Sequence, residues 1–405
     1  MRKDLLSVLF LSFVNMLNFS VLFPVLPFIV KAYHGSPVVY GILISIYSLF
    51  QFLGTPYLGA LSDRYGRKPV LLISYAGTVG SWVLFGLAYF LPTEFIGPLA
   101  LPLLMIGFSR LVDGVTGGNS AVAFAYMSDI TPPAERSKVY GLSGAAMGLA
   151  ILIGPAIGSL TSSTSYGYVG TAIAAGCISL GTMIWVAFSL RESFPEEKRT
   201  RHIEWNPFAH MNILEKIKSY QGRNNINTLF LTRWLFGIVF SGYTAIAILF
   251  IIDRFNFGQN QLGWFLLFLG SFLIFNQGVM VRRFVERFGT VKSLLIGLFC
   301  IGLGLFFIIT TRSLVVYILY YYILNLGFSL TMPTFKALLS SAVSESKQGE
   351  VMGIDESIMA LTAAISPTLS GALYEVFGGL VFWVMSGIVL TSLYLLKDLS
   401  SAEKT

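Results

Sequence analysis

The chain has 405 residues, of which 55% are hydrophobic and only 12% are charged. Soluble domains carry about 25% charged residues, so this composition excludes an ordinary soluble protein and indicates one that crosses a membrane several times. The net charge of +7 does not require a nucleic-acid partner, because Lys and Arg gather on one side of membrane proteins.

Apolar stretches of about 20 residues can span the hydrocarbon of a bilayer. We expect twelve such spans, at residues 5–30, 38–60, 70–90, 99–126, 139–163, 168–190, 227–252, 260–281, 292–310, 314–339, 349–372 and 378–396. With the N-terminus inside, 21 of the 27 Lys and Arg residues lie at inner ends and loops, three lie in outer loops and three lie within spans. This bias predicts cytoplasmic termini. We expect the membrane to be the cell (inner) membrane.

The first two spans carry embedded polar side chains. Asn15 and Asn18 in the first span can hydrogen-bond to a neighbouring helix or line a substrate cavity, and both interpretations stay open. Tyr47 and Gln51 in the second span are four residues apart, so they lie on one helical face and are candidates for lining the same cavity.

A short charged turn, residues 59–69, joins the second and third spans. It contains every fixed position of the loop 2–3 motif of the major facilitator superfamily, G-x-L-x-D-R-x-G-R-K-P, and the chain therefore resembles that family. The resemblance implies a gate formed by Gly59, Asp63, Arg64, Gly66, Arg67 and Lys68. We expect Gly59 to let neighbouring helices approach closely. The alternative, a plain positive-inside anchor, leaves Asp63 without a role.

The resemblance covers essentially the whole chain and implies an all-α membrane protein with twelve transmembrane helices in two pseudo-symmetric six-helix bundles. An internal repeat agrees with it, because residues 139–155 match residues 351–367 at an offset of 212. We expect an N-terminal bundle at 1–190, a cytoplasmic linker at 191–226 and a C-terminal bundle at 227–405. Apolar residues at helical spacing predict an amphipathic helix over 207–220 of the linker.

The first span also resembles helix 1 of tetracycline-type drug:proton antiporters, which ends in a similar Pro-Val-Leu-Pro run. Those relatives have a membrane-embedded Asp where this chain has Asn15. An Asn can hydrogen-bond to a substrate but cannot carry a proton, so this coupling group is missing.

The fourth span holds Arg110 and Asp113, which share a helical face. A charge inside a membrane is costly unless it is paired or hydrated, so an ion pair is the simplest interpretation. The stretch resembles the family's helix 4 motif, R-x-x-x-G, which implies a second interpretation. In it, Asp113 carries the proton and Arg110 tunes the pKa of Asp113. Gly117, Gly118 and Asn119 are small enough to pack against helix 1 or 5, and Asn119 is also a candidate cavity residue.

The loop after the fourth span resembles the matching loop of drug:proton antiporters through Glu135 and Arg136. We expect Glu135 to pair with Arg64 and Arg136 with Asp63, which would latch the inner gate. The alternative is solvated charge.

The fifth span contains Gly154, Pro155 and Gly158, with Ser159 after them. This resembles the antiporter motif G-P-x-x-G-G, which implies export, with Ser159 replacing the last Gly. A proline kink and small residues would let helices 5 and 8 slide together.

The second half has its own polar residues. We expect Arg233 to extend to the inner surface. The candidate cavity residues are Asn276, Gln277 and Asn325. Lys336 is the expected partner of Asp355 and Glu356 in an inner gate, which we prefer to a role in substrate binding.

Together these features predict a secondary active transporter that exports a small amphipathic, drug-like compound by proton antiport with alternating access. The alternatives are another cargo (a lipid, a siderophore or a metabolite), a proton-independent facilitator, or a non-transporting receptor or scaffold. The expected partners are a small-molecule substrate, protons and the lipid bilayer, with no nucleic acid and the protein a monomer. We expect no cofactor, no metal site and no enzymatic centre.

Overall fold

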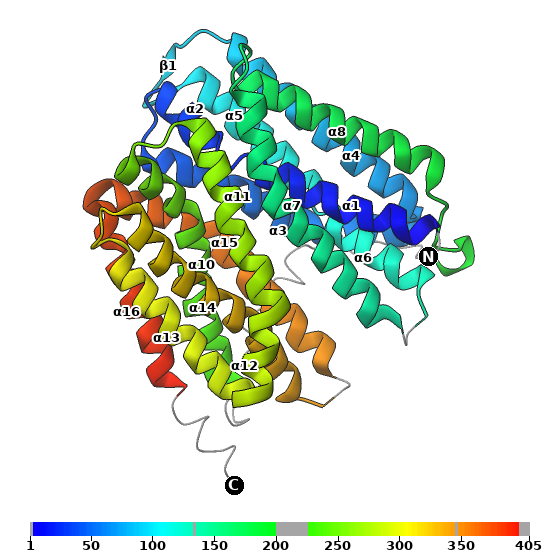
Figure 1. Ribbon diagram of the computed structural model, residues 1–405. Coiled ribbons are helices and arrows are strands. Elements are labelled where there is room, and N and C mark those ends of the chain that lie inside the picture. Colours follow the sequence, from blue (N-terminus) through cyan, green and yellow to red (C-terminus); the bar gives the residue numbers. More distant parts are fainter. Residues whose placement is uncertain (1–2, 133–134, 200–225, 345–346, 397–405) are drawn as a thin grey trace. The chain divides into compact units, whose positions relative to one another are not determined.

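The computed structural model describes residues 3–132, 135–199, 226–344 and 347–396, and most of these lie in helices (Figure 1). Within these ranges, nine helices are long and apolar enough to cross a membrane, and one of them, Gln348–Leu395, covers two of the predicted spans. The all-α, multi-pass membrane fold is therefore confirmed, and the number of twelve spans stays a prediction. The predicted amphipathic helix at 207–220 lies outside the described residues.

The chain forms two compact units, Met1–His210 with Phe257–Leu267, and Met211–Asn256 with Phe268–Thr405. Helices of the first unit are α1 (Lys3–Ser20), α2 (Leu26–Ala32), α3 (Pro37–Tyr65), α4 (Arg67–Leu87), a 3-10 turn (Ala88–Phe90), α5 (Leu101–Thr116), α6 (Asn119–Ile130), α7 (Arg136–Ser162), α8 (Tyr168–Ser189) and a 3-10 turn (Glu196–Lys198). A short antiparallel hairpin, β1 (Phe95–Ile96) and β2 (Leu99–Ala100), precedes α5.

The helices of the second unit, apart from the start of α11, are α10 (Ile226–Phe255), α11 (Gln259–Phe275), a π-helical segment (Asn276–Met280), α12 (Val281–Phe288), α13 (Thr290–Ile308), α14 (Leu314–Ser341), α15 (Gln348–Phe377), a 3-10 turn (Gly378–Leu380) and α16 (Val381–Leu395). Here α10 packs along α15, and α13 packs along α14. These contacts bury one face of each helix against its neighbour.

Two predicted spans are broken helices rather than continuous ones. The first, 5–30, divides into α1 and α2, with Pro24 in the connecting turn and Pro27 in the first turn of α2. Proline lacks the N–H that continues a helix, which explains both positions. The fourth, 99–126, divides into α5 and α6 at Gly117 and Gly118.

A hydrophobic core fills the space between α1, α4, α6 and α8 of the first unit. Val14, Tyr75, Tyr126 and Val186 come one from each helix, and each is at most 1% exposed. Tyr75 keeps its polar atom satisfied, because its hydroxyl donates to the carbonyl of Leu11 at 3.2 Å. This packing holds α4 in place beside the helices that carry the candidate site.

The start of α11 belongs to the first unit because it packs on α7. The hydroxyl of Ser159 donates to the carbonyl of Gln259 at 2.8 Å. A Cβ on Gly263 would lie only 2.1 Å from the Cβ of Ser159, so the two helices touch closely here. The predicted domain ranges did not anticipate that residues 257–267 group with the N-terminal part of the chain.

Candidate functional site

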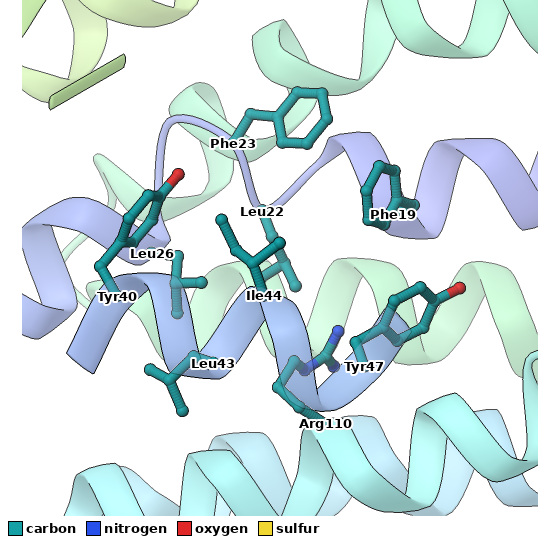
Figure 2. Close-up of a pocket in the computed structure, with 9 residues that line it drawn as sticks. All are labelled: Phe19, Leu22, Phe23, Leu26, Tyr40, Leu43, Ile44, Tyr47 and Arg110. Carbon is teal, nitrogen blue, oxygen red and sulfur yellow. The ribbon is translucent and has the colours of Figure 1, made fainter. Parts of the chain in front are cut away.

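The first unit contains a small cavity of about 30 Å³ that is lined mainly by apolar and aromatic side chains. Its lining residues are Phe19, Leu22, Phe23, Leu26, Tyr40, Leu43, Ile44, Tyr47 and Arg110. Figure 2 shows the guanidinium of Arg110 reaching from α5 toward Leu22, Ile44 and Tyr47. The cavity therefore joins one charged group to an otherwise apolar wall.

Arg110 forms the predicted ion pair with Asp113 inside the unit. Its Nη1 lies 3.0 Å from Asp113 Oδ2, and the two side chains are only 3% and 7% exposed. The rings of Trp82 and Phe85 on α4 also face the guanidinium, whose Cζ lies 5.2 and 5.5 Å from their centroids. Aromatic faces attract a cation, so α4 helps to hold Arg110 in place.

Asp113 has further polar neighbours on α4. The hydroxyls of Thr78 and Ser81 lie within hydrogen-bonding reach of its carboxylate. A cation and hydroxyl donors favour the ionised form of a carboxyl group, whereas burial favours the neutral form. The neighbours of Asp113 and its burial therefore act in opposite directions on its ionisation.

Tyr47 and Gln51 of α3 lie at the same place, as their spacing predicts. The amide nitrogen of Gln51 donates to the Tyr47 hydroxyl and to the carbonyl of Gly117, each at 3.2 Å. The ring of Tyr47 also stacks on Phe19 of α1, with centroids 5.5 Å apart. Only Tyr47 of this pair lines the cavity, and Gln51 instead ties α3 to the break between α5 and α6.

The expectation that Gly117 and Gly118 pack against helix 1 or 5 is wrong. A Cβ on Gly118 would lie 2.7 Å from Thr55 Cα, and one on Gly117 would lie 3.2 Å from the Tyr47 hydroxyl. Both neighbours belong to α3, which corresponds to the second predicted span. The lack of side chains lets α3 approach the break closely.

The asparagines of the first span link helices. Asn15 of α1 donates to the side-chain oxygen of Asn119 on α6. Asn18 accepts from the hydroxyl of Ser179 on α8 at 3.2 Å. None of the three asparagines lines the cavity. These contacts favour the interhelical interpretation over cavity lining.

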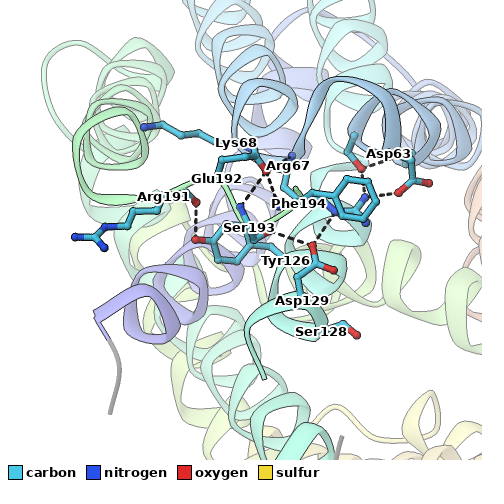
Figure 3. A network of polar contacts seen from close by, with 12 residues as sticks. Asp63, Arg67, Lys68, Tyr126, Ser128, Asp129, Arg191, Glu192, Ser193 and Phe194 are labelled. Carbon is cyan, nitrogen blue, oxygen red and sulfur yellow. Dashed lines mark hydrogen bonds and ion pairs between the residues drawn. The ribbon is translucent and has the colours of Figure 1, made fainter. Parts of the chain in front are cut away.

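The loop motif forms a polar network around Arg67, which Figure 3 shows. The Arg67 side chain is 8% exposed and contacts Asp63 at 2.6 Å and Asp129 at 3.1 Å. It also donates to the Ser62 hydroxyl at 2.6 Å and lies against the ring of Phe194, 4.5 Å from its centroid. Arg67 thus joins the ends of α3, α4 and α6 to the segment after α8.

The expected latch pairs differ from those in the structure. Asp63 pairs with Arg67 instead of Arg136. Arg136 donates to the carbonyls of Ser128 and Thr131 at the end of α6, where a cation stabilises the carboxyl end of a helix. Arg64 lies over the ring of Tyr65, and Glu135 is exposed with no ion pair among the described residues.

Two motif glycines have opposite surroundings. Gly66 adopts φ of +99° between α3 and α4, a conformation that glycine adopts freely. A Cβ there would also lie 2.4 Å from Glu192 Oε2. Gly59 has no atom within 4 Å of a built Cβ, so the expectation that it lets helices approach closely is wrong in this structure.

Sequence reasoning missed Glu192, which binds the start of α4. Its two carboxylate oxygens accept from the backbone N–H groups of Arg67 and Lys68, at 2.8 and 3.1 Å. Helix starts have unsatisfied N–H groups and attract negative charge, so Glu192 acts as a distant cap. Lys68 is held separately by the carbonyl of Ala187 at 2.7 Å. The acidic residue directly after a span was the available signal, but its partner lies 125 residues away.

The antiporter-like motif in α7 faces α1. A Cβ on Gly154 would lie 1.9 Å from the Ser20 hydroxyl, and one on Gly158 would lie 2.0 Å from the Val21 carbonyl. The expected partner of this face was the eighth predicted span, 260–281, which contains α11. That is wrong for the two glycines, but Ser159 and the carbonyl of Pro155 do contact α11.

The second unit holds a buried ion pair that the sequence analysis missed. Arg233 of α10 is 1% exposed and Asp355 of α15 is fully buried. They share two parallel contacts, one of them from Nη2 to Oδ2 at 3.2 Å. The predicted extension of Arg233 to the inner surface is therefore wrong. The side chain is buried and neutralises the charge of Asp355. Lys336 pairs with Glu356, at 2.6 Å, and not with Asp355, which was the other expected partner.

The remaining polar candidates of the second unit lie where α11 ends. Asn276 donates to the side-chain oxygen of Asn325 at 3.0 Å, and both are buried. Gln277 is exposed. Asn276 and Gln277 open the π-helical segment, a rare local geometry that is frequent at functional sites. The described residues include no group of three or more His, Cys, Asp and Glu that could hold a metal ion.

Comparison with known sequences gives consistent matches. A family model described as Major Facilitator Superfamily matches residues 8–354 and again 279–405. The tetracycline resistance protein, class C, of Escherichia coli is 27% identical over 92% of this chain and 91% of the relative. The Bos taurus major facilitator superfamily domain-containing protein 10 is 25% identical over 90% of this chain and 79% of the relative.

Solved structures match along nearly the full length. The human organic anion transporter MFSD10 has a TM-score of 0.71 and 22% identity, with 98% of this chain and 99% of that chain covered. A D-xylose-proton symporter has a TM-score of 0.76 and 16% identity, with 97% and 98% covered. At these identities the structures support the fold alone.

Proposed function

Since the chain belongs to the major facilitator superfamily, we propose that it exports a small amphipathic compound in exchange for protons, by alternating access. The chain is a multi-pass membrane transporter of small molecules and not an enzyme. Relatives named tetracycline resistance proteins, 24% to 27% identical, support export as the direction. The proposal extends to a monomer in the cell membrane with cytoplasmic termini.

The observation that carries the proposal is the buried Arg110–Asp113 pair beside the aromatic cavity. A buried ionisable group in a membrane span is a functional candidate, since it is costly to keep there. In this mechanism, Asp113 binds a proton from one side and loses it to the other. Each form of Asp113 favours a different state of the transporter, so that the proton gradient drives the cargo.

Asp355 is the competing carboxylate. Both of its oxygens contact Arg233, so its charge is neutralised by a two-contact pair. Asp113 makes only one contact with its arginine, from Arg110 Nη1 at 3.0 Å, and its other polar neighbours are the neutral hydroxyls of Thr78 and Ser81. It stands next to the cavity-lining guanidinium. Two parallel contacts hold a carboxylate more firmly than one, which favours Asp113 as the group that exchanges protons.

A proton-independent facilitator is the second candidate function. It is favoured by Asn15, which cannot carry a proton, where the drug antiporters that the first span resembles have Asp. Other cargo, such as a lipid, siderophore or metabolite, is compatible with either mechanism.

The test uses purified protein in liposomes with a pH-sensitive dye inside. A panel of fluorescent amphipathic compounds of different charge is added with and without an imposed pH gradient. Antiport predicts accumulation of at least one compound only with the gradient, together with counter-movement of protons. Equilibration that the gradient does not change would support the facilitator instead.

A further inference from the structure

Arg110 has more hydrogen-bond donors than the protein uses. Its Nη1 contacts Asp113, but Nε and Nη2 are buried and have no hydrogen-bond partner among the described residues. Buried donors without an acceptor are costly, and the cost is greater for a charged group. The residue is only 2% exposed, so bulk water does not supply the acceptor.

The cavity lies next to these donors, and its wall is mainly apolar and aromatic. Phe19, Phe23, Tyr40 and Tyr47 contribute aromatic rings to its wall, and Arg110 is its only charged lining residue. A volume of about 30 Å³ holds no more than water, so a larger ligand must displace side chains. Phe19, Phe23 and Tyr47 are half-buried, and we expect them to be the side chains that a ligand displaces.

We infer that the cargo is an aromatic compound that presents acceptor oxygens, such as a carboxamide or carboxylate, to Nε and Nη2 of Arg110, and that a cationic amine is not accepted. The planar guanidinium offers these donors in a fixed fork, which suits two oxygens or one oxygen shared between them. The aromatic ring would lie among Phe19, Phe23 and Tyr47. A cationic group could lie against the aromatic rings, but it would be repelled by the charge of Arg110 and would leave Nε and Nη2 without an acceptor.

Asp113 does not change this conclusion. Its carboxylate already faces Arg110 Nη1 and the hydroxyls of Thr78 and Ser81, and it does not line the cavity. Arg110 therefore presents the positive end of the pair to the ligand. The inference rests on the proposed function only in taking this cavity as the cargo site, and it does not depend on proton coupling.

The test measures binding without any gradient. The full chain is placed in nanodiscs, with empty nanodiscs as the blank, and dissociation constants are measured for three probes that share one ring system: 1-naphthamide, 1-naphthoate and 1-naphthylmethylammonium. A hydrogen bond to a charged donor changes affinity by about tenfold or more. We expect the amide, the carboxylate or both to bind at least about tenfold more tightly than the ammonium. A tighter carboxylate identifies an anionic cargo, and a tighter amide an uncharged one.

The variant is Arg110→Met with Asp113→Asn, which removes both buried charges together and leaves neither unpaired. Its preference for the acceptor probes should fall to less than about threefold. The matched control is Arg282→Gln with Glu286→Gln, which removes an exposed ion pair of α12 and should keep the wild-type preference.

The inference would be overturned if the wild type bound the ammonium as tightly as it binds the better of the two acceptor probes. A preference that survives in the Arg110→Met, Asp113→Asn variant would overturn it too. Failure of all three probes to bind would also count against it. A protein without proton coupling still shows the preference, whereas a protein without the preference can still exchange protons. The two proposals therefore fail separately.

Discussion

Arg110 and Arg233 are both arginines buried in helices, yet their guanidinium groups are used differently. Arg233 gives two contacts to Asp355 and a third, at 3.6 Å, to the sulfur of Met332. Arg110 gives one contact to Asp113, and two of its donors have no hydrogen-bond partner in the part of the chain that the structure describes. An ion pair whose arginine donors all have partners favours stability. An ion pair beside a cavity that leaves arginine donors without acceptors favours ligand binding and proton exchange.

Asp113→Asn tests the proton-coupling role. The amide cannot ionise, but it keeps an oxygen that accepts from Arg110, so the pocket should stay intact. We expect cargo exchange down its gradient to continue while uphill accumulation falls to a ratio of about one. Liposome transport with and without a pH gradient measures this. Uphill accumulation at the wild-type level would show that protons pass through another group.

Asp355→Asn tests the structural role of the second pair. It leaves Arg233 as a buried charge without a full counter-charge, and breaking a buried pair costs about 3–5 kcal/mol. We expect a clear loss of thermal stability in detergent, with partial rescue when Arg233→Met is added. Surviving protein should still accumulate cargo with the gradient. Normal stability together with lost coupling would instead make Asp355 the proton carrier.

At the scale of the elements, the junction of α3 and α4 is stabilised by residues that are distant in the sequence. Glu192 caps α4, Arg67 joins Asp63 and Asp129, and Phe194 covers the guanidinium. The segment after α8 is therefore part of the loop motif in space. A change in that segment can reach the junction through Glu192 and Phe194.

Gly66→Ala and Gly59→Ala form a matched pair for this junction. Ala at Gly66 must adopt φ of +99° and displace the Glu192 carboxylate, whereas Ala at Gly59 meets no atom within 4 Å. We expect Gly66→Ala to cost about 1–2 kcal/mol of stability and to reduce transport. Gly59→Ala should match the wild type in melting temperature and activity. Equal behaviour of the two variants would contradict the geometry of the junction.

The packing of α7 on α1 gives a second prediction. Gly158→Leu places a large side chain against the Val21 carbonyl and Pro24, at the break between α1 and α2. Overpacking of this kind costs about 1–3 kcal/mol, and here backbone atoms must move. Export should fail and the melting temperature should fall, whereas Gly148→Leu on the same helix has open space and should be tolerated. Unchanged export by Gly158→Leu would mean that α1 can move to accommodate the larger side chain, which would contradict the prediction.

At the scale of the whole molecule, the orientation in the membrane is testable from two loops. Glu94 is exposed between α4 and α5, and Glu197 is exposed after α8. In a background with Cys177→Ala and Cys300→Ala, Glu94→Cys should react with an impermeant maleimide added to intact cells. Glu197→Cys should react only after permeabilisation, because the positive residues of that side retain it in the cytoplasm. The reverse pattern would invert the proposed topology.

The sequence by itself determined the fold class, the family resemblance and most positions of the helices. Apolar length is a local property, and a charged motif with fixed spacing is read directly from the chain. The Arg110–Asp113 pair and the Tyr47–Gln51 face were also predictable, because residues three or four apart in a helix are neighbours.

Only the tertiary structure decided which distant residues meet. Arg233 and Asp355 are 122 residues apart, and Glu192 reaches the start of α4 from 125 residues away, so no helical period could reveal either contact. The same holds for the small residues of α7, whose partner could have been any neighbouring helix. Spacing predicts the face on which a side chain lies, but burial and partner depend on which helices pack together, and that is a property of the folded chain.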